Sequence, residues 1–155
     1  HGQGSGPAII FLHGFFSDQR LWDDVIAPRR RHHRCIALDL PGHGGTDDWR
    51  GPATWDGLCA ELDRLIAAAG PPGSVGIVGY SMGSRLLRQL LLRPGPALGT
   101  AVLIAPHPGW DVAGGRARRA ADGLLAQSLL SRPLTGSVAP WASLPVFSGP
   151  ARASA

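Results

Sequence analysis

The chain has 155 residues, of which 44% are hydrophobic, and its formal net charge is +4. This composition is too apolar for a disordered chain, and the length suits one domain with a buried core. The sequence has no apolar run long enough to cross a bilayer, and its N-terminus lacks a charged segment followed by an apolar one. It therefore predicts neither a membrane span nor a secretory signal.

All 15 basic side chains are arginines, and the densest run of them lies at residues 29–34. We interpret this run as a solvated loop that leads into a strand, because a nucleic-acid surface more often mixes lysine with arginine. No nucleic-acid or membrane partner is predicted. Cys35 and Cys59 fall in a predicted strand and a predicted helix. We expect them to be reduced core residues of a cytoplasmic protein, without a disulfide or a metal site.

Short apolar runs alternate with helical patterns along the first two thirds of the chain. The apolar runs predict buried strands at residues 8–13, 35–40, 74–80 and 100–105. Apolar residues at helical spacing predict helices at residues 19–27, 54–69 and 82–92. The first helix is expected to end at Pro28, and Thr54 is expected to cap the second. This alternation predicts an α/β fold with a mostly parallel sheet and helices on both faces.

From His107 onward the pattern changes. Residues 114–130 predict an amphipathic helix with arginines on one face, and residues 136–147 predict a short helical piece broken by proline. No further strand is predicted. We therefore expect a single domain over residues 1–155, with a sheet core of about four strands at residues 1–106 and a helical lid at residues 107–149.

The segment Gly79-Tyr80-Ser81-Met82-Gly83 fits the pattern G-x-S-x-G and lies where a predicted strand meets a predicted helix. A turn this tight strains the backbone of the serine, and small residues two positions before and after it let the two segments pass. The hydroxyl of Ser81 then projects above the sheet, beside the positive end of the helix dipole. We interpret Ser81 as a reactive serine. The alternative is a Gly/Ser turn without chemistry.

Two further motifs follow the first two predicted strands. His13-Gly14-Phe15-Phe16 ends the first strand, and the segment LDLPGHGGTD at residues 38–47 ends the second. We interpret His13 as a structural histidine, with a catalytic base as the alternative. We interpret Asp39 and His43 as parts of a hydrogen-bonded turn, because their spacing matches no metal-ligand pattern.

Together these three motifs resemble the α/β-hydrolase superfamily, and the resemblance extends over the whole chain. It implies an α/β-hydrolase fold with a helical lid. It also implies an oxyanion hole made by the backbone N–H groups of Phe15 and Met82.

The residues around and after Ser81 resemble one family more closely, the 2-succinyl-6-hydroxy-2,4-cyclohexadiene-1-carboxylate (SHCHC) synthases of menaquinone biosynthesis. The segments that carry this resemblance are residues 80–85, 107–109 and 116–122, and Trp141 with residues 144–147. Arg85 is the most demanding feature, because most esterases have a small or apolar residue there. The resemblance implies a lyase that eliminates pyruvate from 2-succinyl-5-enolpyruvyl-6-hydroxy-3-cyclohexene-1-carboxylate to give SHCHC, with Ser81 as the base.

By the same resemblance, Arg85 and Arg119 bind carboxylates of a small anionic substrate, and Tyr80 lines the pocket. No cofactor and no metal is implied. The alternative for Arg85 is a solvated helix residue. For Arg116, Arg118 and Arg119 the alternative is the surface of the lid.

A reactive serine also needs a base and an acid, which in this fold follow it in the order Asp or Glu, then His. After Ser81 the chain has only Asp111, Asp122 and His107, and His107 comes too early. Asp111 holds a position that some α/β-hydrolases use for the acid. Domains of this type need roughly 200–250 residues. We therefore expect an incomplete domain with an exposed apolar sheet edge, the N-terminal and lid portion of a larger enzyme and inactive alone.

Two alternatives to the lyase stay open. The first is a generic serine hydrolase, an esterase or a C–C bond hydrolase, in which Arg85 and the lid arginines are incidental. The second is a noncatalytic, hydrolase-like module that binds a partner or a small ligand. No oligomeric state is predicted.

Overall fold

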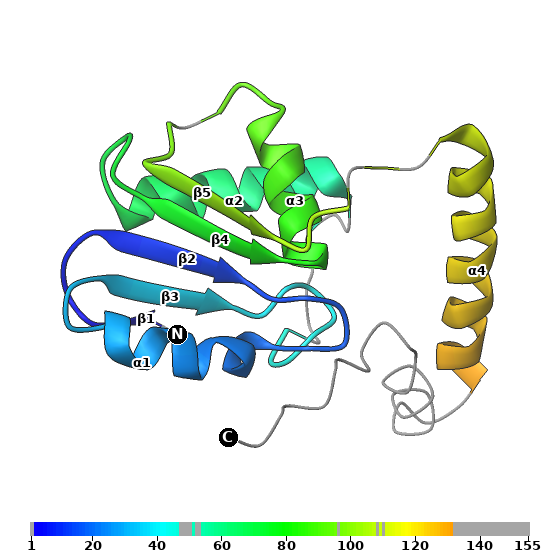
Figure 1. Cartoon of the computed structure of the whole chain (residues 1–155), viewed down its shortest axis with the longest axis horizontal. Helices are drawn as coiled ribbons and strands as arrows, with labels where there is room; N and C mark the ends of the chain where they lie inside the picture. The colour runs from blue at the N-terminus through cyan, green and yellow to red at the C-terminus, as the bar shows by residue number, and fades with distance from the viewer. Residues whose placement is uncertain are drawn as a thin grey trace, which may run out of the picture. The chain divides into compact units, whose positions relative to one another are not determined.

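A computed structural model of the chain describes residues 2–46, 51, 54–95, 97–107, 109 and 111–131 (Figure 1). The chain divides into two compact units, His1–His107 and Pro108–Ala155, and each unit is described by itself. Within the described ranges, no helix is both long and apolar enough to span a membrane.

The first unit is built on a five-stranded sheet with the strand order β1-β3-β2-β4-β5. The strands are β1 (Gly2–Gln3), β2 (Ala8–Leu12), β3 (Arg34–Leu38), β4 (Gly76–Tyr80) and β5 (Thr100–Ile104). The last four are parallel to one another, which confirms the mostly parallel sheet and all four predicted strands. The sequence did not predict β1, which pairs antiparallel with β3, because two residues are too few to show a periodicity.

Four helical segments connect the strands of this unit: η1 (Gln19–Trp22), α1 (Asp23–Arg29), α2 (Trp55–Ala69) and α3 (Met82–Leu91). The predicted end of the first helix at Pro28 is wrong, since Pro28 lies inside α1. A proline this close to the end of a short helix removes one hydrogen bond without stopping the last turn. The predicted cap of α2 is confirmed, because Thr54 Oγ1 accepts a hydrogen bond of 3.2 Å from Gly57 N–H.

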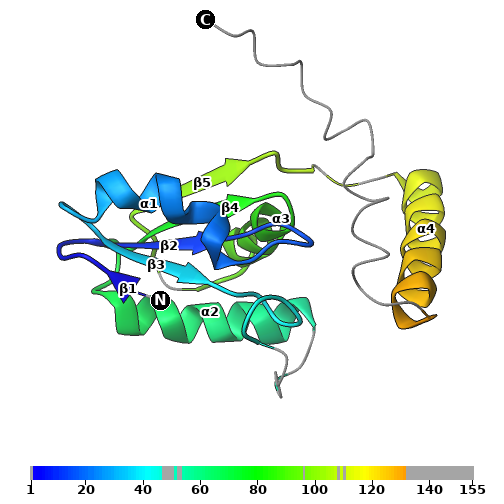
Figure 2. The same cartoon turned by 90° about the horizontal axis from the view of Figure 1, so that it is seen from below.

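Helices cover both faces of the sheet, as predicted: α1 lies on one face, and α2 and α3 lie on the other (Figure 2). Alternate residues of β2 divide the core between these faces. Ile10 and Leu12 pack with α2 and α3, whereas Phe11 packs with Trp22 on the α1 side at a ring-centroid distance of 5.3 Å. The cysteines are buried free thiols, as expected, and burial raises the pKa of both.

The α1 face of the sheet is covered only in part by the described residues. A groove of about 580 Å³ lies over β2, β4 and β5 beside α1. Val102 and Ile104 of β5, the last strand of the sheet, line this groove and remain 41% and 40% exposed. The apolar edge expected from the sequence is therefore present in the part of the chain that the structure describes.

His13 ties together the carboxyl ends of two neighbouring strands. Its ring is fully buried, and Nε2 accepts a hydrogen bond of 2.9 Å from Leu40 N–H. Because Nε2 is an acceptor, the ring proton is on Nδ1, which donates to Gly14 O at 2.7 Å. Both nitrogens are thus occupied by the backbone. This confirms the structural interpretation of His13 and contradicts the alternative of a catalytic base.

Two glycines let α3 pass close to the sheet. A Cβ atom added to Gly83 would lie 2.4 Å from Leu12 O, and one added to Gly79 would lie 2.6 Å from Gly83 O. These neighbours are backbone atoms of β2 and α3, which cannot move aside alone. The approach of α3 to β2 and β4 therefore requires glycine at both positions.

The second unit contains α4 (Val112–Ser131), which confirms the predicted helix at residues 114–130. The predicted helical piece at residues 136–147 lies outside the described residues. Asp111 caps α4, because its Oδ1 accepts a hydrogen bond of 2.7 Å from Gly114 N–H. No residue of α4 is buried. The predicted single domain with a helical lid stays a prediction.

We predict that Gly83→Ala lowers the free energy of unfolding of the first unit by about 2 kcal/mol or more, because the added methyl group meets the Leu12 carbonyl. Urea unfolding measures the change. Gly123→Ala on α4 is the control, since nothing lies within 4 Å of its added Cβ. The control should leave this unfolding transition unchanged. Equal stability of the two variants would contradict the tight approach of α3.

His13 predicts a pH-dependent stability. Burial lowers the pKa of His13 below its ordinary value, so the folded chain keeps the ring neutral where the unfolded chain binds a proton. The contribution of His13 to the free energy of unfolding is fully present above about pH 6.5. As the pH decreases below that value, the contribution decreases by at most about 1.4 kcal/mol per pH unit. Urea titrations at several pH values should show this slope in the wild type and a shallower one in His13→Asn. The exposed His32 provides the control, and His32→Asn should keep the wild-type slope.

Candidate active site

Ser81 forms the turn between β4 and α3 in a backbone conformation that non-glycine residues rarely adopt. Its φ is 51° and its ψ is −105°. Two backbone hydrogen bonds hold it there, since Ser81 N–H donates to Ile104 O and Arg85 N–H donates to Ser81 O, both at 3.0 Å. Such a conformation costs roughly 1–3 kcal/mol and persists only where its surroundings impose it. The geometry matches the strained turn predicted from G-x-S-x-G.

Ser84 is a structural support of this turn that the sequence analysis missed. It is fully buried, and its Oγ lies 2.6 Å from Gly79 O and 2.8 Å from Ile104 O. The same oxygen accepts a hydrogen bond of 3.0 Å from Ile104 N–H. Ser84 therefore joins β4, α3 and β5, and its hydroxyl shares the acceptor Ile104 O with Ser81 N–H. A small polar residue three positions after the serine was the only local signal.

The loop after β2 lies directly against the turn. A Cβ on Gly14 would come within 3.0 Å of the Tyr80 ring and 3.4 Å of Ser81 Cβ. In addition, Gly83 N–H donates to His13 O at 3.1 Å. The structure thus brings together two motifs that are more than sixty residues apart in the sequence.

Strained backbone is concentrated at this edge of the sheet. Among the described residues, those with a positive φ that are not glycine are Phe16, Ser81 and Ala105, at 54°, 51° and 50°. They follow β2, β4 and β5, which are neighbours in the sheet, so all three lie beyond its carboxyl end. Ligand sites of open parallel sheets lie at this end, and backbone strain clusters at functional sites.

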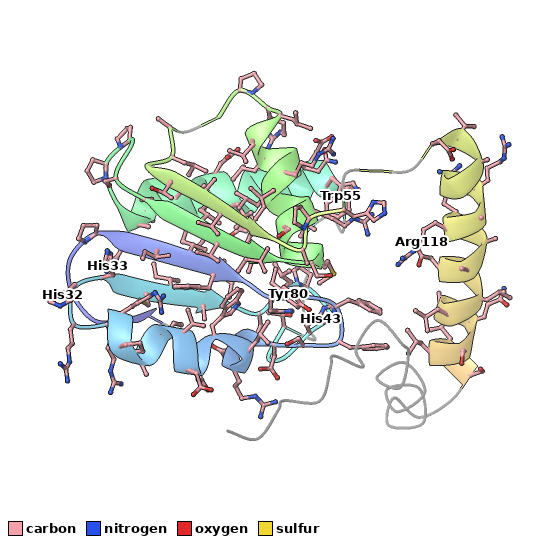
Figure 3. All side chains as sticks on the ribbon, viewed as in Figure 1. His32, His33, His43, Trp55, Tyr80 and Arg118 are labelled. Atoms are coloured by element: carbon pink, nitrogen blue, oxygen red, sulfur yellow. The ribbon has the colours of Figure 1, made fainter. Side chains whose placement is uncertain are left out.

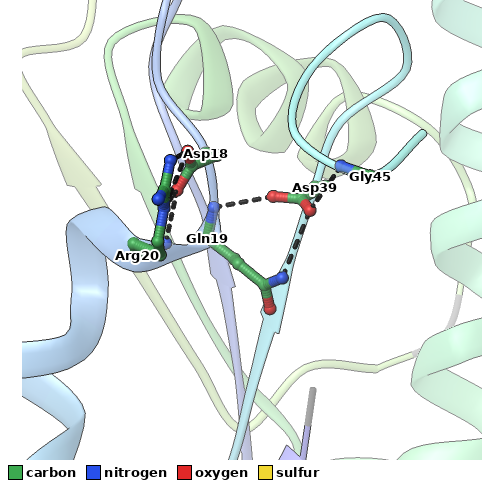
Figure 4. A network of polar contacts seen from close by, with 5 residues as sticks. All are labelled: Asp18, Gln19, Arg20, Asp39 and Gly45. Carbon is green, nitrogen blue, oxygen red and sulfur yellow. Dashed lines mark hydrogen bonds and ion pairs between the residues drawn. The ribbon is translucent and has the colours of Figure 1, made fainter. Parts of the chain in front are cut away.

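Asp39 orders the segment after β3 (Figure 4). Its Oδ1 accepts a hydrogen bond of 2.7 Å from Gln19 N–H, and its Oδ2 accepts from Gln19 Nε2 at 3.2 Å and Gly45 N–H at 3.0 Å. Beside it, a hydrogen bond from Arg20 lowers the pKa of Asp18 to about 2. With its carboxylate used in this way, Asp39 acts as the structural residue that the sequence predicted. The described residues hold no cluster of three or more His, Cys, Asp or Glu side chains that suits a metal.

His43 packs the segment after β3 against the loop after β2. Its Nδ1 lies 3.0 Å from Pro41 O, which confirms the predicted turn. Its ring centroid lies 5.2 Å from that of His13 and 5.7 Å from that of Phe15, the latter edge-on. The ring of Phe15 also stacks on Phe16 at 4.3 Å. These contacts fix the loop that carries Phe15 next to Ser81.

The backbone N–H groups predicted for the oxyanion hole belong to this same region. Met82 is the first residue of α3, where an N–H group has no carbonyl partner within the helix. Phe15 follows Gly14, where an added Cβ would come within 3.4 Å of Ser81 Cβ. The positive end of the α3 dipole favours negative charge here. The oxyanion hole itself stays a prediction.

Arg85 lies one helical turn after Ser81 and is exposed. Its guanidinium carbon lies over the indole ring of Trp55, 5.6 Å from the ring centroid. Trp55 is the first residue of α2, and Figure 3 shows it with Tyr80 and His43 at the end of the sheet toward which the strands run. The exposed guanidinium is therefore available to a ligand at this edge.

The remaining predicted residues lie on other segments. Arg119 is exposed on α4 in the second unit, so its role in a shared pocket stays a prediction. On the same helix Arg118 Nε donates to Asp122 Oδ1 at 2.8 Å. Asp122 thus has a partner on its own helix, and Asp111 caps α4. His107 is exposed just beyond β5.

Comparison with known proteins extends these observations. A family model described as alpha/beta hydrolase fold matches residues 7–131. An SHCHC synthase of Salmonella paratyphi C is 35% identical over 152 residues, and the match covers 94% of this chain and 57% of that protein. An SHCHC synthase of Salmonella choleraesuis matches equally well. The chain thus spans little more than half the length of these relatives.

Solved structures show the same fold. The structure of MenH from S. aureus matches with a TM-score of 0.83 and 27% identity, and covers 92% of this chain and 54% of that one. An epoxide hydrolase from Vigna radiata matches with a TM-score of 0.60 and 26% identity, over 75% of this chain and 40% of that one. The family model also spans all four parallel strands and the turn at Ser81. The chain therefore belongs to the alpha/beta hydrolase fold family.

Proposed function

We propose that this chain provides the serine and arginine part of an SHCHC synthase, a lyase that eliminates pyruvate in menaquinone biosynthesis. Relatives that carry this name are 35% identical over most of the chain. The observation that supports the proposal most is the position of Arg85. Its exposed guanidinium follows the strained Ser81 by one helical turn, where it can bind a substrate carboxylate.

In the proposed reaction, Ser81 Oγ removes a proton from the ring carbon that bears the succinyl group. The electron pair left behind shifts through the ring double bond, and the C–O bond to the enolpyruvyl group breaks. That group takes up a proton and leaves as pyruvate, while the ring becomes the cyclohexadiene of SHCHC. Negative charge that develops on the succinyl carbonyl oxygen is stabilised by the N–H groups of Phe15 and Met82.

The arginines and Tyr80 give the proposed pocket its preference for anions. Arg85 binds one carboxylate with two parallel N–H···O bonds, and Arg119 is proposed to bind another. Tyr80 is proposed to line the pocket, since its ring lies 3.0 Å from the position that an added Cβ on Gly14 would take. No cofactor takes part in this proposal.

Ser81 acts as a base only after another group has taken its own proton. The rings of His13 and His43 bond to backbone groups instead. We therefore propose that the 155-residue chain binds the product SHCHC but does not turn over substrate by itself. Full lyase turnover by the purified chain would contradict this part of the proposal.

A generic serine hydrolase is the second candidate, and the match to the family model of the alpha/beta hydrolase fold supports it. In that case Arg85 is a solvated helix residue, and carboxylates on the ligand contribute little to binding. The two candidates therefore differ in what Arg85 does. A noncatalytic binding module would share the fold but would not require the strain at Ser81.

We predict that Arg85→Ala weakens binding of SHCHC to the chain by roughly tenfold to a thousandfold, the scale of a bidentate, charge-assisted hydrogen bond. Titration calorimetry measures the affinity. Arg88→Ala is the matched control, because it removes an equal charge from the same helix. This control should bind within about twofold of the wild type. Equal affinity of Arg85→Ala and the wild type would favour the generic hydrolase.

We predict that Ser81→Gly stabilises the chain by about 1 kcal/mol, because glycine adopts a φ of 51° without steric cost. Ser81→Ala is the control, since alanine keeps the strain and removes only the hydroxyl. Urea unfolding compares the two variants. If a reactive serine is kept here at a cost in stability, the glycine variant should be more stable than both the wild type and the alanine variant. If Ser81→Gly is no more stable than Ser81→Ala, the backbone at this turn is not strained.

A further inference from the structure

The contact between Arg85 and Trp55 sets Arg85 apart from other arginines of the chain. Four arginines form ion pairs with carboxylates in the described residues: Arg20 with Asp18, Arg64 with Glu61, Arg93 with Asp63 and Arg118 with Asp122. Among these described residues, Arg85 forms no ion pair with a carboxylate. Its guanidinium lies over the indole ring of Trp55 instead. Within the residues that the structure describes, no carboxylate therefore neutralises its charge.

A cation–π contact holds a guanidinium through its charge and needs no hydrogen bond to the ring. A cation within about 6 Å of a tryptophan ring centroid is attracted to the face of the ring. The N–H groups of arginine lie in the plane of the guanidinium and point away from its edges, so an aromatic face leaves them free. The 5.6 Å contact thus favours conformations of Arg85 that keep its guanidinium over the indole ring, and no carboxylate of the described residues takes up its N–H groups.

Trp55 is well placed to do this because its own backbone is fixed. It begins α2 directly after Thr54, whose hydroxyl caps the helix through Gly57 N–H. The side chain is 41% exposed, so it serves no core that would explain its size. In a right-handed crossover, the helices α2 and α3 both begin at the carboxyl edge of the sheet. Trp55 and Ser81 therefore flank Arg85 at the same edge.

We infer that Trp55 is a positioning residue for Arg85 and raises its affinity for a planar carboxylate. This inference rests on the proposed function, in which Arg85 binds a carboxylate of the substrate. By holding the guanidinium before the ligand arrives, Trp55 reduces the ordering that binding would otherwise require. An oriented, planar guanidinium also favours a carboxylate, which accepts two parallel hydrogen bonds, over an anion that is attracted by charge alone.

The test compares binding of SHCHC to the 155-residue chain and its variants by titration calorimetry. Trp55→Ala should weaken binding about threefold to tenfold, and Trp55→Phe should restore most of the affinity, because phenylalanine keeps an aromatic face. In an Arg85→Ala background, Trp55→Ala should have no further effect. Leu91→Ala, which removes another exposed apolar side chain, is the control and should bind as the wild type does.

A measurement without ligand tests the contact between Trp55 and Arg85 independently of the proposed function. In nuclear magnetic resonance spectra, the Nε–H signal of Arg85 should shift upfield in the wild type and in Trp55→Phe, and return to an ordinary position in Trp55→Ala. A role of Trp55 in stability alone would not move this signal.

Each outcome decides between the inference and the proposed function. If Arg85→Ala loses binding but Trp55→Ala binds as the wild type does, the inference is wrong and the proposed function stands. If Trp55→Phe binds as poorly as Trp55→Ala, the aromatic face is not the cause and the inference is also wrong. If the wild type and Arg85→Ala bind SHCHC equally, or neither binds, the carboxylate role of Arg85 fails and the inference falls with it.

Discussion

The close approach of α3 to the sheet is the constraint on which the candidate site depends. Gly79 and Gly83 bring the start of α3 against the backbone of β2 and β4, and this forces Ser81 into a positive φ. The buried hydroxyl of Ser84 then joins this turn to β5. Because each contact involves backbone atoms, the serine is held in place by the fold itself. Its strain is therefore maintained by the packing of three parallel strands and one helix.

The same constraint places charge where the proposed reaction needs it. Starting α3 at Met82 aims the positive end of its dipole at the carboxyl edge of the sheet, and Arg85 follows one turn later. The guanidinium then lies over the Trp55 ring, and Arg85 has no carboxylate partner among the described residues. Histidines at this edge have a different task, since His13 and His43 bond to the backbone and order the loops. In the proposed function this edge binds an anion, and the imidazoles of His13 and His43 support its loops.

Local patterns predicted the fold well because its strands are short apolar runs between clear turn signals. The serine turn could also be predicted from a local pattern, because the glycines two residues before and after the serine indicate its steric requirement. Contacts between distant segments could not be predicted. Trp55 and Arg85 are thirty residues apart, and Ser84 has the local pattern of an ordinary helix residue. The positive φ of Ala105 likewise lies at a residue that is not glycine, so the sequence did not mark it.

The central claim is that the carboxyl edge of the sheet binds a carboxylate through Arg85 beside Ser81. A crystal structure of the chain with bound SHCHC tests this claim most directly. The account predicts a ligand carboxylate within hydrogen-bond distance of the Arg85 guanidinium, with Trp55 stacked behind it. It also predicts a ligand oxygen facing Met82 N–H. Product bound in the groove beside α1, or Arg85 directed away from the bound ligand, would contradict the account.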